Sequence, residues 1–416
     1  MLIKFQKYIS LILLYLVSST NIYSDNHKNW TILTYIAGDS DLNKFIDDDL
    51  LQMQQGANNN TNVLAFVNKK INEVKIAQKL VITNDNITND GPDLINLDSG
   101  TKESVMIAIN WAIENYPSDK FALILWDHGS GPLNKILQSF DISITDNIDI
   151  NINDEKGICY DYTTGNFLND RDLAYICKQT KEKINKNIDI VAFDACLMAN
   201  IEIAYAIKDS ACYLVSSQES VPTSGFNYKL ILDSLNKKNL TAQELAKNMV
   251  LTYKETYKDL NNYYTMSAVD LDKIEELTKN INKISVLLSK YLENQKNHRV
   301  DKAITFAAFT NKNIRFNEPD YIDIYNFYFN LANYINIMNL NTADTIQIKK
   351  ALLSGQSLIK SAVIENTSGS KFALVQGLSI YLPTKIHNSY NTLYWATETC
   401  WKTFLNTYIR NQKQIR

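Results

Sequence analysis

The sequence predicts an α/β fold with a mostly parallel central sheet and helices on both of its faces. Short runs rich in β-branched and aromatic residues alternate with longer segments that carry apolar residues at helical spacing. This alternation is typical of strands joined by crossover helices. The 416 residues contain no repeats, heptads or low-complexity linkers, and no composition break marks a second independent domain.

The first unit is a strand, a turn and a helix. Trp30–Ile36 is predicted to be a buried strand, Ala37–Asp39 a turn, and Leu42–Gln55 a helix. The following pattern predicts a strand at Val63–Val67, a hairpin at Val74–Thr83, a helix at Glu103–Glu114 and a third core strand at Phe121–Trp126.

The second half begins with a polar, acidic segment from Pro132 to Lys156, which has no hydrophobic period and is expected to be a loop. A helix at Asp170–Lys183, a fourth core strand at Ile188–Phe193 and a fifth at Tyr213–Ser216 are predicted next. Beyond Thr241 the pattern is mostly helical, with strands expected at Tyr264–Val269, Ile304–Phe309 and Leu378–Leu382.

The N-terminal segment has the pattern of a secretory signal peptide. Lys4 and Lys7 precede the apolar run Ile9–Val17, and small and polar residues follow to Ser24. We expect residues 1–24 to be removed and residues 25–416 to form one mature domain, secreted or periplasmic. The alternative is an N-terminal strand or helix that remains. The apolar run is shorter than the ~20 residues of a membrane span, and no later stretch is long enough, so no stable membrane insertion is expected.

Net charge and cysteine content restrict the classes of function that the chain can have. The net charge of −3 leaves no basic field for nucleic acid. The five cysteines are odd in number and irregularly spaced, so they form no disulfide framework, although pairing among some of them stays open. At least one thiol must be unpaired within a monomer, either as a buried inert group or as a nucleophile.

Reactive groups in open α/β sheets lie in the loops after the carboxyl ends of the strands. The third core strand leads into Asp127-His128-Gly129-Ser130-Gly131, and the fourth leads into Asp194-Ala195-Cys196. A lone histidine or a lone cysteine is more often structural. An imidazole and a thiol at adjacent strand ends are the arrangement needed for nucleophilic acyl transfer, and a helix N-terminus after the fourth strand would favour the thiolate of Cys196. There is no G-x-S-x-G elbow, phosphate-binding loop or C-x-x-C pair.

At these residues the chain resembles the clostripain family of cysteine peptidases. The likeness covers essentially the whole mature chain, and it implies a caspase-like three-layer α/β/α sandwich with a mostly parallel central sheet and additional C-terminal helices. The segments that carry it are Ala37–Leu42, Leu123–Gly131, Lys156–Asp161, Phe193–Ala199, Ser216–Glu219 and Gly377–Pro383.

The resemblance implies a secreted cysteine endopeptidase that acts on peptides or proteins. Cys196 would be the nucleophile and His128 the general base, with no obligatory third carboxylate and no cofactor for the chemistry. The N–H groups of Gly129 and Cys196 would form the oxyanion hole. The oligomeric state stays open.

The resemblance also implies a substrate-binding pocket for Arg or Lys at P1, the residue before the cut. It would be built from Asp194, Gln218, Glu219 and Ser224. The alternative for Asp194 is a carboxylate that only favours a helix dipole. The segment Ser220–Tyr228 departs from the Glu-Pro-Gly-x-Gly-Trp-x-Tyr pattern of relatives. Two readings therefore stay open: a peptidase with non-basic P1 preference and a catalytically silent peptide-binding relative.

Family members are often cut between the histidine and the cysteine, and some need calcium. The segment Pro132–Lys156 offers Lys135 and Lys156 as cut sites and several carboxylates as oxygen ligands for Ca²⁺. The alternative is a solvated surface loop without a metal.

Overall fold

The computed structural model describes residues 27–71, 73–131, 157–236, 239–260, 262–294, 299–309, 316–340 and 342–415. The predicted signal peptide and the acidic segment with Lys135 and Lys156 lie outside the described residues.

A ten-stranded sheet of the described residues forms the middle of the molecule, in the order β11-β9-β8-β7-β6-β1-β2-β3-β4, with β5 paired to β3. The five central strands are parallel: β1 (Lys28–Gly38), β2 (Thr61–Ile71), β6 (Ser118–Trp126), β7 (Ile188–Asp194) and β8 (Ala211–Ser216). Antiparallel strands complete both edges: β3 (Val74–Ile82), β4 (Ile87–Asn89), β5 (Leu94–Ile95), β9 (Thr265–Asp270) and β11 (Val363–Ser368).

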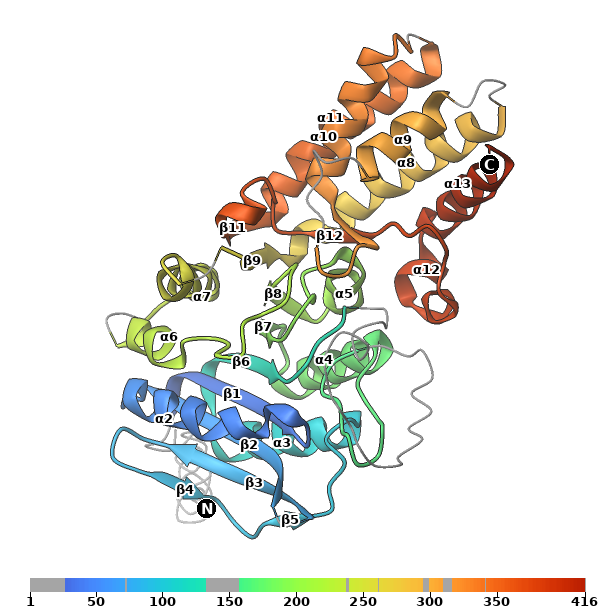
Figure 1. Cartoon of the computed structure of the whole chain (residues 1–416). Coiled ribbons are helices and arrows are strands. Elements are labelled where there is room, and N and C mark those ends of the chain that lie inside the picture. Colours follow the sequence, from blue (N-terminus) through green and yellow to red (C-terminus); the bar gives the residue numbers. More distant parts are fainter. Residues whose placement is uncertain are drawn as a thin grey trace, which may run out of the picture.

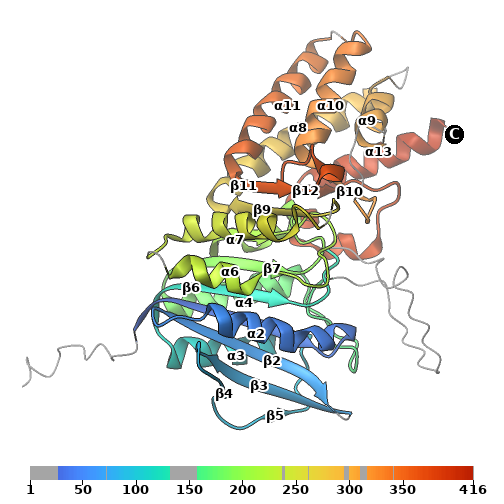
Figure 2. The ribbon, with the colours of Figure 1, turned by 60° about the vertical axis from the view of Figure 1, so that its left-hand side comes forward.

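Helices cover both faces of this sheet, and the predicted three-layer sandwich is confirmed (Figures 1 and 2). Alternate side chains of β1 enter different cores, because Ile32 and Ile36 belong to one buried cluster whereas Leu33 and Tyr35 belong to the other. The first cluster is covered by α2 (Ile46–Gly56), α6 (Tyr228–Leu235) and α7 (Ala242–Tyr257), and the second by α3 (Lys102–Asn115), α4 (Asp170–Ile184) and α5 (Ile201–Ile207).

The additional C-terminal helices are also confirmed. Figure 1 shows them, gold to red, beyond the edge of the sheet where β9 and β11 lie. Their buried side chains belong to the same cluster as those of α3 to α5, so the hydrophobic core runs on into them. They are α8 (Ile274–Asn294), α9 (Arg299–Phe309), α10 (Ile324–Ile337), α11 (Ala343–Ala362), α12 (Tyr394–Glu398) and α13 (Trp401–Ile415), next to a small sheet of β10 (Tyr321–Asp323) and β12 (Ser379–Tyr381).

Two predicted elements are wrong. The run Ile304–Phe309, which is apolar except for Thr305, is helical and ends α9, because such a short stretch fits a buried helix as well as a strand. Val74–Thr83 is not a hairpin by itself; β3 is a single strand that pairs antiparallel with β2. Among the described residues, no helix is both long and apolar enough to cross a membrane.

Candidate active site

The predicted imidazole and thiol lie at the same edge of the sheet. β6 and β7 are parallel neighbours, and their register pairs Trp126 with Asp194. His128 and Cys196 each follow this pair by two residues, so the register brings their backbones level. Both side chains line a cavity of about 200 Å³. The other lining residues are Asp41, Leu42, Lys44, Phe45, Trp126, Asp127, Asp194, Ala195, Val221, Pro222, Thr223 and Gly225.

The loops that follow β6 and β7 touch at Gly129. A Cβ atom at this position would lie 2.5 Å from the carbonyl oxygen of Cys196 and 2.9 Å from Cβ of Ala195. Only glycine allows so close an approach of the two backbones. Within the described part of the chain, neither the N–H of Gly129 nor that of Cys196 donates a hydrogen bond to another group. Both N–H groups lie at the contact between the two loops.

Cys196 lies in a loop and not at the start of a helix. β7 ends at Asp194, whereas α5 begins only at Ile201, where the side chain of Asn200 caps it. Between them, Leu197 has a left-handed φ of 62°. The predicted helix N-terminus beside the thiol is therefore wrong, and so is the alternative that Asp194 serves a helix dipole.

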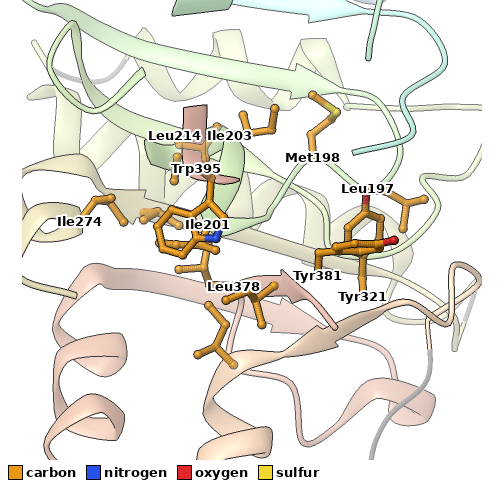
Figure 3. Packing of buried hydrophobic residues seen from close by; sticks show 14 of the residues in the cluster. Leu197, Met198, Ile201, Ile203, Leu214, Ile274, Tyr321, Leu378, Tyr381 and Trp395 are labelled. Atoms are coloured by element: carbon orange, nitrogen blue, oxygen red, sulfur yellow. The ribbon is translucent and has the colours of Figure 1, made fainter. Parts of the chain in front are cut away.

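Buried residues behind the thiol hold this loop in place. Leu197 and Met198 are fully buried, and Figure 3 shows Leu197 beside the rings of Tyr321 and Tyr381. The N–H of Leu197 donates to the carbonyl oxygen of Glu219 at 3.2 Å. The position of Cys196 is thus fixed by the core beneath it, although Cys196 itself is partly exposed.

The thiol of Cys196 is not activated by its own surroundings. Burial raises its pKa to about 11, and the nearby charges of Glu219 and Asp194 act in the same direction. The N–H of Val221 lies 3.2 Å from Sγ and opposes this rise. The thiol is therefore protonated at neutral pH, and forming the thiolate needs a base.

His128 can supply that base. Its Nε2 lies 2.6 Å from Oδ1 of Asp41, and its ring stacks on Tyr162 with 6.3 Å between the ring centroids. Burial lowers the pKa of His128, but the hydrogen bond to Asp41 and the charges of Asp127 and Asp41 outweigh burial and raise it. The imidazolium is stabilised at this position.

Asp41 is a residue of the site that the sequence pattern did not single out. It follows the carboxyl end of β1, the strand beside β6. Strand ends at one edge of a sheet lie close together, which is how His128 and Cys196 were predicted. The position of Asp41 after β1 is the same kind of signal.

Asp127 braces the loop that carries His128. Its carboxylate accepts hydrogen bonds from Oγ of Ser40 at 3.1 Å and from the N–H of Tyr160 at 2.5 Å. Burial raises the pKa of Asp127 to about 7. Three segments that are distant in sequence are joined at this one carboxylate.

Asp194 is a buried residue of the cavity lining. Its carboxylate accepts from the N–H of Phe226 at 3.0 Å and from the hydroxyl of Tyr228 at 2.9 Å. Burial raises the pKa of Asp194 to about 6. Asp49 of α2 is also buried, and burial together with the charge of Asp194 raises its pKa to about 8. Asp49 lies on the apolar face of α2, three residues after Ile46, and this position is the sequence signal for its burial.

The other predicted pocket residues lie outside the cavity lining. The side-chain amide of Gln218 is buried and donates to Ser379 at 2.9 Å and Asp323 at 3.1 Å. The carboxylate of Glu219 accepts from the N–H of Asn317 at 2.8 Å. Oγ of Ser224 lies 2.8 Å from the hydroxyl of Tyr257. These contacts hold the loops behind the cavity.

The other sulfur atoms do not form a second reactive centre. All five cysteines are free thiols, which confirms that there is no disulfide framework. Burial raises the pKa of Cys159 well above its usual value and that of Cys177 to about 12. No group of three or more His, Cys, Asp or Glu residues within the described ranges could hold a metal ion.

The fold and the site together define a class of protein: an α/β/α hydrolase that uses a thiol and an imidazole at the carboxyl edge of a parallel sheet, as cysteine peptidases do. Within this class the chain belongs to the clostripain family, whose sequence profile matches residues 34–408. It is a cysteine-type endopeptidase.

Known relatives agree with this assignment. The chain is 25% identical to clostripain of Hathewaya histolytica over 435 aligned positions, which cover 90% of this chain and 78% of that protein. A secreted C11 cysteine protease from Bacteroides thetaiotaomicron, solved with an irreversible peptide inhibitor, has a TM-score of 0.63 at 19% identity, covering 91% of this chain and 99% of that one. An inactive zymogen C11 protease from Parabacteroides distasonis has a TM-score of 0.58 at 20% identity, covering 89% and 98%. Both structures share the caspase-like fold.

Proposed function

We propose that Cys196 is the nucleophile and His128 the general base of this peptidase. The observation that carries the proposal is the register of β6 and β7, which brings both side chains to one cavity. The thiol proton passes to His128 as sulfur attacks the scissile carbonyl carbon. The C–N bond then breaks, and His128 returns the proton to the leaving amine. Water, deprotonated by His128, hydrolyses the thioester and restores the thiol.

The oxyanion of the tetrahedral intermediate is proposed to accept hydrogen bonds from the N–H groups of Gly129 and Cys196. Both groups lie where the two loops touch, and neither donates to another described residue. Loss of one such donor raises a barrier by about 2.7–4 kcal/mol in other hydrolases.

The P1 side chain is proposed to be Arg or Lys, bound by Asp194. The support is a buried carboxylate in the lining of a cavity that is also lined by Trp126, Val221 and Pro222. The apolar walls suit the methylene stem, and Asp194 suits the cationic head. A non-basic P1 residue is the second candidate, because the same walls also suit an aliphatic side chain.

Hydrolysis of fluorogenic peptides ending in Arg, Lys, Asn, Asp or Leu tests these roles. The parent chain is compared with Cys196→Ala and Asp194→Asn. We expect cleavage after Arg and Lys, none by Cys196→Ala, and a selective rise in KM for basic peptides with Asp194→Asn. Cleavage after Leu that depends on Cys196 would keep the mechanism and reject the basic pocket. Activity that survives Cys196→Ala would reject the nucleophile.

Export and maturation are proposed from the sequence. Residues 1–24 would be removed on secretion, and N-terminal sequencing of protein from the medium and the periplasm tests this. Cleavage after Lys135 or Lys156 would give a two-chain enzyme. If a double Lys→Ala variant keeps full activity as one intact chain, self-processing is rejected. Assays in EDTA and in added calcium test the acidic segment at 132–156 as a calcium site.

A further inference from the structure

Asp41 binds the Nε2 edge of the His128 imidazole. Its Oδ1 lies 2.6 Å from Nε2 of His128, and the hydroxyl of Tyr162 donates to the same oxygen at 3.3 Å. The Tyr162 ring lies nearly parallel to the imidazole, with 5° between the planes. The His128 ring is thus held by a carboxylate at its edge and by an aromatic ring at its face.

Asp41 is itself held by contacts that do not involve the thiol loop. It begins a short 3-10 helix, η1 (Asp41–Phe45), capped by the side chain of Ser40. Just before it, the carbonyl oxygen of Asp39 accepts the N–H of Tyr162 at 2.9 Å. The Asp39 carboxylate lies 3.5 Å from the buried ammonium of Lys75. These contacts hold the segment that carries Asp41 against Tyr162 and Lys75.

A carboxylate 2.6 Å from Nε2 determines which tautomer the neutral ring adopts. Ionised carboxylates only accept hydrogen bonds, so Nε2 carries the hydrogen and Nδ1 carries the lone pair. The hydrogen bond to His128 lowers the pKa of Asp41, which keeps this carboxylate ionised at neutral pH.

We propose that Asp41 is a positioning residue that orients the His128 ring, fixes the Nε2–H tautomer and stabilises the imidazolium formed when Nδ1 takes the thiol proton. The assignment rests on the proposed role of His128, and it adds a carboxylate as a third residue to a reaction for which the resemblance required only a cysteine and a histidine. The need is physical: the Cys196 thiol, whose pKa is about 11, gives up its proton only to a well-stabilised acceptor.

Two variants of this site test separately the charge of Asp41 and the hydroxyl group of Tyr162. Asp41→Asn keeps an oxygen that can accept from Nε2 but removes the charge. We expect kcat to fall about 10- to 100-fold, with KM changed less than about threefold and the melting temperature retained. Tyr162→Phe keeps the ring stack and loses the hydroxyl, so we expect a smaller fall of about two- to fivefold.

A second readout does not depend on turnover. The histidine resonances of the intact chain are titrated by NMR, with His128→Ala assigning the signal. In Asp41→Asn the pKa of His128 should fall, and the acidic limb of kcat/KM should move to lower pH with it. The ionisable groups that contact the imidazole or Asp41, or that line the same cavity nearby, are Asp41, Asp127, Tyr162, Cys196 and Lys44.

Asp47→Asn is the matched control, because Asp47 is an exposed acid on the adjoining α2 whose carboxylate lies 3.7 Å from Lys69. It should leave kcat and the His128 titration unchanged. The proposal is wrong if Asp41→Asn keeps kcat within twofold with an unmoved titration, or if it raises only KM, which would place Asp41 on the substrate. The proposed function is tested separately, by whether Cys196→Ala loses activity.

Discussion

Replacement of Gly129 by alanine tests how the two loops create the site. The added Cβ would lie 2.5 Å from the carbonyl oxygen of Cys196, whereas ordinary contacts begin near 3.4 Å. The loops after β6 and β7 must then separate by about 0.9 Å at the point where Gly129 lies against Cys196. Misplacement of reacting groups by about 1 Å costs on the order of 100-fold in rate. We therefore expect kcat/KM to fall about 30- to 100-fold.

The assay compares kcat/KM on a P1-Arg peptide, the melting temperature and the rate of Cys196 alkylation by iodoacetamide. Turnover should fall far more than alkylation, because the small reagent needs no oxyanion hole. Gly91→Ala is the control: its φ of 107° is strained for alanine, yet no atom lies within 4 Å of the new Cβ. It should lower the melting temperature and spare kcat/KM. A folded Gly129→Ala enzyme with activity within twofold of the parent would refute this reasoning.

Three further predictions concern buried charges. Asp49 has a pKa of about 8 in the folded chain, against about 3.9 when unfolded, so the folded state binds more protons and the unfolding free energy falls as pH rises from about 4 to 8. Asp49→Asn should raise the melting temperature at pH 9 and not at pH 4. The exposed Asp48→Asn is the control and should not show this difference. Equal shifts at both pH values in Asp49→Asn would contradict the prediction. With a pKa of about 6, Asp194 should lose affinity for P1-Arg peptides below that pH, seen as a rising KM that P1-Leu peptides and Asp194→Asn do not show. Lys75→Met leaves the buried Asp161 and Asp39 without their cation and should cost about 3–5 kcal/mol in urea unfolding, whereas Lys79→Met, on the same strand, should cost little.

The order of strands and reactive residues could be predicted from the sequence because it depends on local features. His128 and Cys196 each follow an apolar run of strand length. Parallel neighbouring strands have their carboxyl ends at one edge of the sheet, so the two residues lie at that edge. Where the local pattern was ambiguous, prediction failed. The run Ile304–Phe309 fits a buried helix and a strand equally well, and only its packing decides between them.

What only the tertiary structure decided is the environment of each reactive group. Asp41 and His128 are 87 residues apart in sequence, and no local pattern reports their contact. The same holds for Gln218, whose buried amide donates to Ser379, 161 residues further along the chain. The sequence determined which reactive groups, an imidazole and a thiol, lie at the carboxyl edge of the sheet. Burial and charge from distant segments determined their pKa values, because protonation depends on everything that surrounds a group, and only the folded chain supplies those surroundings.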